Sequence, residues 1–176
     1  MLLWDTFFAA GQGQLANSAY GKAEELLKSA LAEADSFPVD DPRLLRTRLA
    51  LIEVFQKSGR IEGANPFLAQ ADEQIAQAPG LPPELTASVI EAKLRQVDLG
   101  GADQSERLKL GMQLVRLWKN AGPDHLQPLV DSLLRLSDFE KAAADEVSAR
   151  ASLEQALEKS LELEGPNHTG PAAILS

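Results

Sequence analysis

Hydrophobic residues recur every three or four positions along nearly the whole chain, which is the period of an amphipathic α-helix. The clearest stretch is residues 20–34, YGKAEELLKSALAEA, in which Ala23, Leu27 and Ala30 share one face. Two small residues on either side of a large one allow a second helix to approach closely. We therefore predict a helix over residues 20–35.

Seven further segments have the same period and are separated by turns, most of them rich in Pro and Gly. We predict helices over residues 2–17, 43–57, 61–77, 83–98, 104–120, 124–136 and 139–164. Asp41 is expected to cap the helix over 43–57, with Pro42 at its first position. Pro66 is expected to delay or bend the start of the helix over 61–77. Ser137 and Asp138 are predicted to cap the last helix.

The small–Leu–small triplet recurs about every 40 residues, a period typical of a helical solenoid. Three copies are Ala23–Leu27–Ala30, Ala64–Leu68–Ala71 and Ala149–Leu153–Ala156, and a further copy, Gln104–Leu108–Gly111, has Gln in place of the first small residue. In a solenoid, stacked helical hairpins bury one continuous core. We predict a single all-α domain over residues 1–176, built from four units over 2–37, 42–78, 83–120 and 123–165. We expect residues 166–176 to form a tail or the start of a further helix.

These residues resemble the tetratricopeptide repeat (TPR), in the longer-period form found in kinesin light chains and many bacterial proteins. The matching positions are Gly11, Tyr20, Ala23, Leu27 and Ala30 in the first unit, and Ile52, Gly59, Ile61, Ala64, Leu68 and Ala71 in the second. The resemblance is strong over about residues 4–77 and weaker over 83–165. It implies a right-handed superhelix with a groove lined by the first helix of each pair. It also implies binding of a peptide or protein.

Repeat register indicates which polar residues would line this groove. Counting from the matched Ala to the first helix of each unit gives Gln12, Arg46, Glu53, Gln56, Lys93 and Gln96. An ordinary solvated helix face is the alternative interpretation. The Lys/Asn set with which family members clamp a C-terminal carboxylate is not reproduced, because Gln12 stands where Asn is expected. We therefore do not predict binding of chaperone tails.

The ends of the array are a second candidate surface. A possible end interface comprises Trp4, Phe8 and Ile174. For Trp4 and Trp118, packing in the core is the first interpretation, and an exposed indole would mark an interface. Terminal repeats usually have a polar outer face or an added helix. For the last residues we expect one of three arrangements: a lid folded back on the array, pairing with another copy, or continuation into a longer array.

The composition narrows the classes of partner. The net charge is −9, which disfavours a nucleic-acid partner because phosphate backbones repel an acidic chain. The absence of cysteine excludes disulfides and thiolate metal sites, and is consistent with a cytoplasmic protein. No apolar run approaches the roughly 20 residues of a membrane helix, so we expect no membrane insertion. The N-terminal segment lacks a basic start and carries Asp5, so it is not interpreted as a signal sequence.

The chemistry of an enzyme is not evident. His125 and His168 are the only histidines and are expected in capping or turn roles. Glu154, Glu158 and Glu162, with Lys159 nearby, fit a solvated helix stripe. No nucleotide-binding loop and no GxSxG motif occurs. We predict no catalytic residue, metal or cofactor.

The sequence thus indicates a protein-interaction scaffold that binds a peptide or helix of a partner in its groove. The first alternative is a structural or assembly module that self-associates through its terminal hairpins into a homo-oligomer. The second is a helical enzyme or small-ligand sensor, which would need a deep pocket with convergent polar groups and perturbed pKa values.

Overall fold

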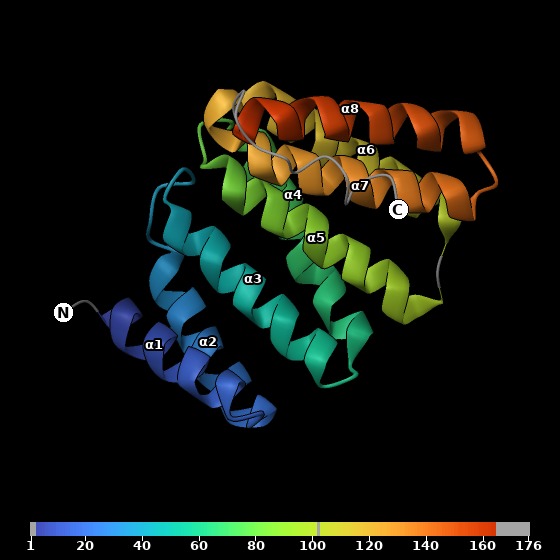
Figure 1. Cartoon of the computed structure of the whole chain (residues 1–176). Coiled ribbons are helices and arrows are strands. Elements are labelled where there is room, and N and C mark those ends of the chain that lie inside the picture. The colour runs from blue at the N-terminus through green and yellow to red at the C-terminus, as the bar shows by residue number, and fades with distance from the viewer. Residues whose placement is uncertain (1–2, 102, 165–176) are drawn as a thin grey trace. The chain divides into compact units, whose positions relative to one another are not determined.

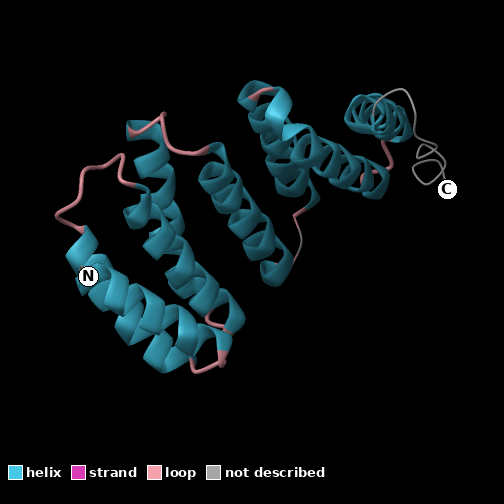
Figure 2. Cartoon of the chain, turned by 60° about the vertical axis from the view of Figure 1, so that its left-hand side comes forward, coloured by secondary structure: helices cyan, strands magenta, loops and turns pink. Residues whose placement is uncertain are grey.

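A computed structural model describes residues 3–101 and 103–164 of the chain, and within them the secondary structure is entirely helical (Figure 2). The prediction of an all-α fold is confirmed. The chain divides into two compact units, Met1–Gly101 and Ala102–Ser176. Each unit is described by itself.

The first unit consists of α1 (Leu3–Ala16), α2 (Tyr20–Ala34), α3 (Pro42–Lys57), the 3-10 helix η1 (Ile61–Ala64), α4 (Asn65–Gln77) and α5 (Pro83–Gly100). α1 and α2 form one hairpin, and α3 forms the next with η1 and α4 (Figure 1). α3 packs on the first hairpin, and α5 packs on α3 and α4. Consecutive hairpins therefore stack within this unit, as in a solenoid.

The small–Leu–small triplets form the contacts between these helices. Ala23, Leu27 and Ala30 have no solvent-exposed surface, and Leu27 packs with Ala50 and other α3 residues. A Cβ atom added at Gly11 would lie only 2.7 Å from Cγ of Leu27. The first hairpin is closely packed because α1 has no side chain at this position.

Two predicted helix starts are confirmed. The carboxylate of Asp41 accepts a 2.9 Å hydrogen bond from the backbone N–H of Arg43, and Pro42 is the first residue of α3. α4 begins only at Asn65, after a 3-10 turn, with Pro66 as its second residue. Proline is tolerated there because the first helical N–H groups have no partner within the helix.

The second unit consists of α6 (Gln104–Ala121), the 3-10 helix η2 (Pro123–His125), α7 (Leu126–Ala142) and α8 (Glu146–Glu164). α7 packs between its two neighbours in sequence, α6 and α8. Gly111 of α6 faces Leu136 and Phe139 of α7. Where the usual small residue is replaced by Gln104, its amide donates a hydrogen bond to the carbonyl of Phe139.

The predicted break between the last two helices is wrong. Ser137 and Asp138 lie inside α7, and the connection is at residues 143–145. Ser137 is buried and donates its hydroxyl to the carbonyl of Leu134, so it does not act as a cap. The turn uses Ala144 at φ +59°, and Asp145 accepts a hydrogen bond from the N–H of Ser148. A helix-favouring run of alanines concealed this turn in the sequence.

The boundary between the units falls inside the third predicted repeat, residues 83–120. α5 ends at Gly100, followed by Gly101 in the left-handed region at φ +110°, and Asp103 caps α6. The single domain, the hairpin over 83–120 and the handedness of the array stay predictions.

Candidate functional site: a groove between α1, α3 and α5

Two adjoining pockets lie between the first helices of consecutive repeats. One, of about 290 Å³, is lined by Phe8, Gln12, Arg46, Leu49, Ala50, Glu53, Ser88, Glu91 and Arg95. The other, of about 550 Å³, is lined by Glu53, Gln56, Lys57, Arg95, Asp98 and Leu99. Because Glu53 and Arg95 line both, the pockets form one continuous surface, the α1–α3–α5 groove.

The two walls of this groove alternate in charge. From N- to C-terminus, the α3 wall presents Arg46, Glu53 and Lys57. The α5 wall presents the opposite order of signs, with Glu91, Arg95 and Asp98. The groove thus carries as many basic as acidic side chains, although the whole chain has a net charge of −9. A ligand here meets donors and acceptors in a fixed order, which sets register more than overall attraction.

Within the α3 wall, Glu53 and Lys57 form an ion pair of 2.7 Å between Oε1 and Nζ. The hydrogen bond from Lys57 to Glu53 raises the pKa of the Lys57 amine. Both side chains are partly or largely exposed, so the pair is worth little to stability.

Gln56, on the floor of the groove, is 6% exposed and is fully engaged. Its amide nitrogen donates to the carbonyl of Ala92 at 2.7 Å and to Oε1 of Gln96 at 3.1 Å. Its oxygen accepts from Nε of Arg95 at 3.3 Å. Gln56 therefore fastens α5 to α3 and fixes the width of the groove.

Gln96 and Lys93, two of the six predicted groove residues, do not line the groove. Gln96 donates to the carbonyl of Ile61 at 2.6 Å and to Oδ1 of Asn65 at 2.9 Å. Lys93 forms an ion pair with Asp72 of α4. Both side chains point to η1 and α4, because the residues of α5 that line the groove lie on another face of that helix. The structure brings the other four together: Gln12, Arg46, Glu53 and Gln56.

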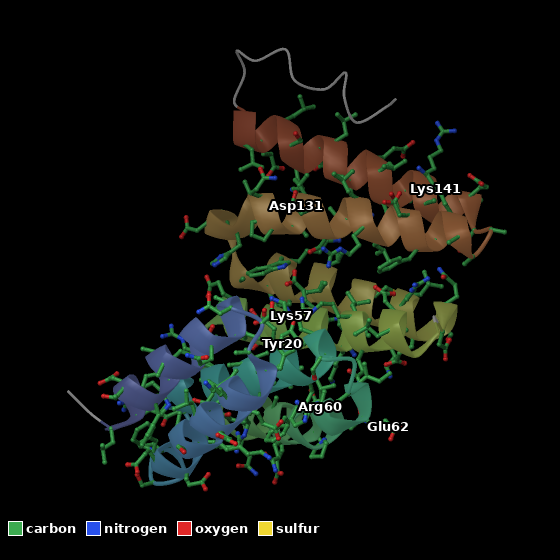
Figure 3. All side chains as sticks on the ribbon, turned by 90° about the horizontal axis from the view of Figure 1, so that it is seen from below. Tyr20, Lys57, Arg60, Glu62, Asp131 and Lys141 are labelled. Carbon is green, nitrogen blue, oxygen red and sulfur yellow. The ribbon has the colours of Figure 1, made fainter. Side chains whose placement is uncertain are left out.

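Arg60, labelled in Figure 3, ties the turn after α3 to α2. Nη1 of Arg60 lies 2.8 Å from Oε2 of Glu24, and its guanidinium lies 4.9 Å from the ring centre of Phe55. Hydrogen bonds from Lys28 and from Arg60 lower the pKa of Glu24. Arg60 thus has a structural role, whereas Lys57 lines the groove.

Trp4, a candidate for the end interface, lies in the core, as its first interpretation expects. It is 7% exposed, and its Nε1 donates a 2.9 Å hydrogen bond to the hydroxyl of Thr47. Phe8 stacks on Trp4 with ring centres 4.7 Å apart and lines the groove. The buried Trp4 indole therefore offers no surface for an end interface, while Ile174 lies outside the described residues.

The other aromatic and histidine predictions concern the second unit. Trp118 is buried, as the core interpretation expects, and it stacks on His125 at 5.4 Å. His125 ends the 3-10 turn η2 directly before α7, so it has the predicted turn role, without a side-chain cap hydrogen bond. His168 lies outside the described residues. Glu154, Glu158 and Glu162 are exposed and pair with Arg150 or Lys159, as expected for a solvated stripe.

The sequence prediction placed α5 in the groove through Lys93 and Gln96, but missed the α5 residues that line it. Ser88, Glu91, Arg95 and Asp98 are spaced three or four residues apart and so share one face. This spacing was visible in the sequence. Which face of α5 turns toward α3 was not, because that depends on how α4 packs against it.

Two features are absent from the part of the chain that the structure describes. Within residues 3–101 and 103–164, no three His, Cys, Asp or Glu side chains are grouped so as to hold a metal ion. None of the helices in these ranges is long and apolar enough to cross a membrane.

No protein-family model matches the chain, and no curated protein matches its sequence. Among solved structures, the chain is similar to BtubC (BKLC) from P. vanneervenii, a bacterial kinesin light chain-like repeat protein, with a TM-score of 0.77 at 16% sequence identity. The match covers 94% of this chain and 66% of BtubC, so the chain spans slightly less than two thirds of that protein's length. This likeness confirms the predicted fold, a TPR-type helical repeat.

Proposed function

We propose that this protein is a non-enzymatic, cytoplasmic scaffold that binds a peptide or helix of a partner protein in the α1–α3–α5 groove. The observation that carries the proposal is a continuous groove formed by the first helices of consecutive repeats. The fold of the solved relative, a repeat protein, also supports a protein partner.

The groove combines the two features of a peptide site. Phe8 and Leu49 supply an apolar surface, whose burial would provide binding energy. The alternating charges of the α3 and α5 walls would fix the register and direction of the bound segment. Gln56 holds the walls at a fixed separation, so little ordering of the groove is needed on binding.

The chemistry of the groove supports binding over catalysis. Lys57 has its pKa raised by Glu53 and therefore stays charged at neutral pH, the opposite of what a general base needs. The acidic net charge of the chain supports a partner other than nucleic acid.

Selection of peptides from a displayed library against the full chain tests the proposal. Selected peptides are then titrated by fluorescence anisotropy against the wild type, Arg46→Glu and Arg95→Glu. We expect at least about tenfold weaker binding to both variants. Each variant puts an acidic side chain where the selected peptide meets a basic one. Arg150→Glu, the same charge reversal on α8, is the matched control and should bind as wild type. Peptides that bind all four proteins equally would contradict a groove site.

A further inference from the structure

One exposed face of α1 is equivalent, in repeat position, to a face of α3 that is buried. α3 receives the preceding hairpin on Leu44, Thr47, Ala50, Leu51 and Val54, all of them buried. Ala23 and Ala64 are equivalent positions of the first two repeats. The same offset between repeats makes five α1 residues equivalent to these five α3 residues: Leu3, Thr6, Ala9, Ala10 and Gly13. All five are exposed, Leu3 to 61%. α1 therefore presents to solvent the face on which another hairpin packs in α3.

The buried copy of this face shows what its partner must supply. Leu44 packs with Trp4, Ala30 and Ala34, and Thr47 accepts the indole hydrogen bond. Further along α3, Leu27 of α2 packs with Ala50, Leu51 and Val54. The corresponding face of α1 has smaller side chains, Ala9, Ala10 and Gly13, and so leaves a gap on the helix surface. A large side chain from a facing helix would fill this gap.

α8, the last described helix, carries a ridge of large side chains. Leu153, Leu157 and Leu161 follow one another at four-residue intervals, so they form one ridge along the helix. Ala23 of α2 and Ala149 of α8 are equivalent repeat positions. By the same offset, Leu153 and Leu157 are equivalent to Leu27 and Leu31, which pack toward α3. Leu153 and Leu157 are half-buried, and Leu161 is 45% exposed.

We propose that a second copy of this chain places the Leu153–Leu157–Leu161 ridge of its α8 on the Leu3–Thr6–Ala9–Ala10–Gly13 face of α1. The two surfaces are complementary in shape, since leucines of one helix enter the gap left by small residues of the other. The α1 face is uncharged, so the contact avoids direct repulsion between two chains that each carry −9.

This contact is head-to-tail. Two α1 faces placed together would bring small residues against small residues and leave the gap unfilled. A head-to-tail contact leaves one of the two surfaces free at each end of the assembly, so further copies can add. The mean mass of the assembly therefore rises with protein concentration. The surface is separate from the α1–α3–α5 groove, and the proposal does not rest on the proposed function.

Sedimentation equilibrium of the full chain over a wide concentration range tests the contact. The wild type should exceed its monomer mass of 19.0 kDa increasingly as concentration rises. Ala10→Arg, on the α1 face, and Leu161→Arg, on the α8 ridge, should each stay monomeric. Both substitutions are at exposed helical positions and use a good helix former, so folding is retained, as checked by circular dichroism. Ala69→Arg, at an exposed position of α4, is the matched control and should behave as wild type.

A mixture of the two monomeric variants gives the decisive result. Ala10→Arg keeps an intact α8 ridge, and Leu161→Arg keeps an intact α1 face. Their equimolar mixture should therefore reach twice the monomer mass and no more. A wild type that stays monomeric up to about 0.5 mM would overturn the proposal. So would association of Leu161→Arg by itself, which would indicate a contact between two α1 faces.

Discussion

The indole nitrogen of Trp4 donates a hydrogen bond of 2.9 Å to the hydroxyl oxygen of Thr47, and so joins α1 to α3 across 43 residues of sequence. The same hydroxyl donates to the carbonyl of Arg43 within α3 at 2.8 Å. Thr47 thus serves as acceptor to one helix and donor to its own. The bond lies in the core cluster that holds the first two hairpins together.

Replacing Trp4 by Phe should lower the free energy of unfolding by about 1–2 kcal/mol, from the lost hydrogen bond and the smaller ring. Urea denaturation followed by far-UV circular dichroism measures this loss. Thr47→Val removes the acceptor, and the double variant should lose less than the sum of the two single variants. Strict additivity would show that the hydrogen bond contributes nothing.

Gly11 and Gly13, two residues apart on α1, should respond to alanine with opposite signs. At Gly11 the added methyl group would meet Leu27 at 2.7 Å, so Gly11→Ala should destabilise by about 1–3 kcal/mol. At Gly13 no heavy atom outside the local backbone lies within 4 Å of the added carbon. Gly13→Ala should therefore stabilise the helix, by about 0.5–1 kcal/mol. Thermal unfolding of the pair checks the prediction, and equal effects would show that α1 and α2 are less closely packed.

Gln56 and Gln12 both line the groove but should differ in their contribution to stability. Gln56→Leu removes two donated hydrogen bonds and one accepted bond at a buried position, and we expect a loss of about 1–2 kcal/mol. Gln12→Leu, at a half-buried position on the groove, should change stability by less than about 0.5 kcal/mol. Chemical denaturation distinguishes the two. A large loss for Gln12→Leu would mean that this amide has a structural role.

Asp41 should make the stability of the first unit depend on acid pH. Hydrogen bonds from the Arg43 side chain and backbone lower the pKa of the Asp41 carboxyl in the folded protein. A depressed folded pKa stabilises the protein above the unfolded pKa, and this stabilisation is lost as the pH falls through the folded value. Stability should therefore fall with acidification below about pH 4.

Asp41→Asn is the matched variant for this test, since it keeps a side-chain oxygen to cap α3 but removes the charge. Its unfolding free energy, measured from pH 2 to pH 7, should show a shallower acid dependence than that of the wild type. Identical slopes would assign the acid sensitivity to other carboxyl groups.

The helices and their repeat could be predicted because they follow from local periodicity. Ala23, Leu27 and Ala30 are three and four residues apart, and any helix brings them onto one face that must be covered. Asp41 and Pro42 mark a helix start for equally local reasons. The break before α8 escaped prediction because residues 142–144 are alanines, whose helix propensity argues against a turn. There the capping by Asp145 and the packing of α7 outweigh propensity.

By itself the sequence determined that this protein is an all-α helical repeat, and its resemblance to TPR proteins implied a groove lined by the first helices. It could not assign partners to the polar side chains. Gln96 binds the carbonyl of Ile61, Lys93 pairs with Asp72, and Trp4 is buried beneath Thr47. Each of these contacts joins residues distant in sequence, and helical period says nothing about which face of a neighbouring helix lies opposite. Only the tertiary packing decided which polar residues hold the helices together and which are left to line the groove.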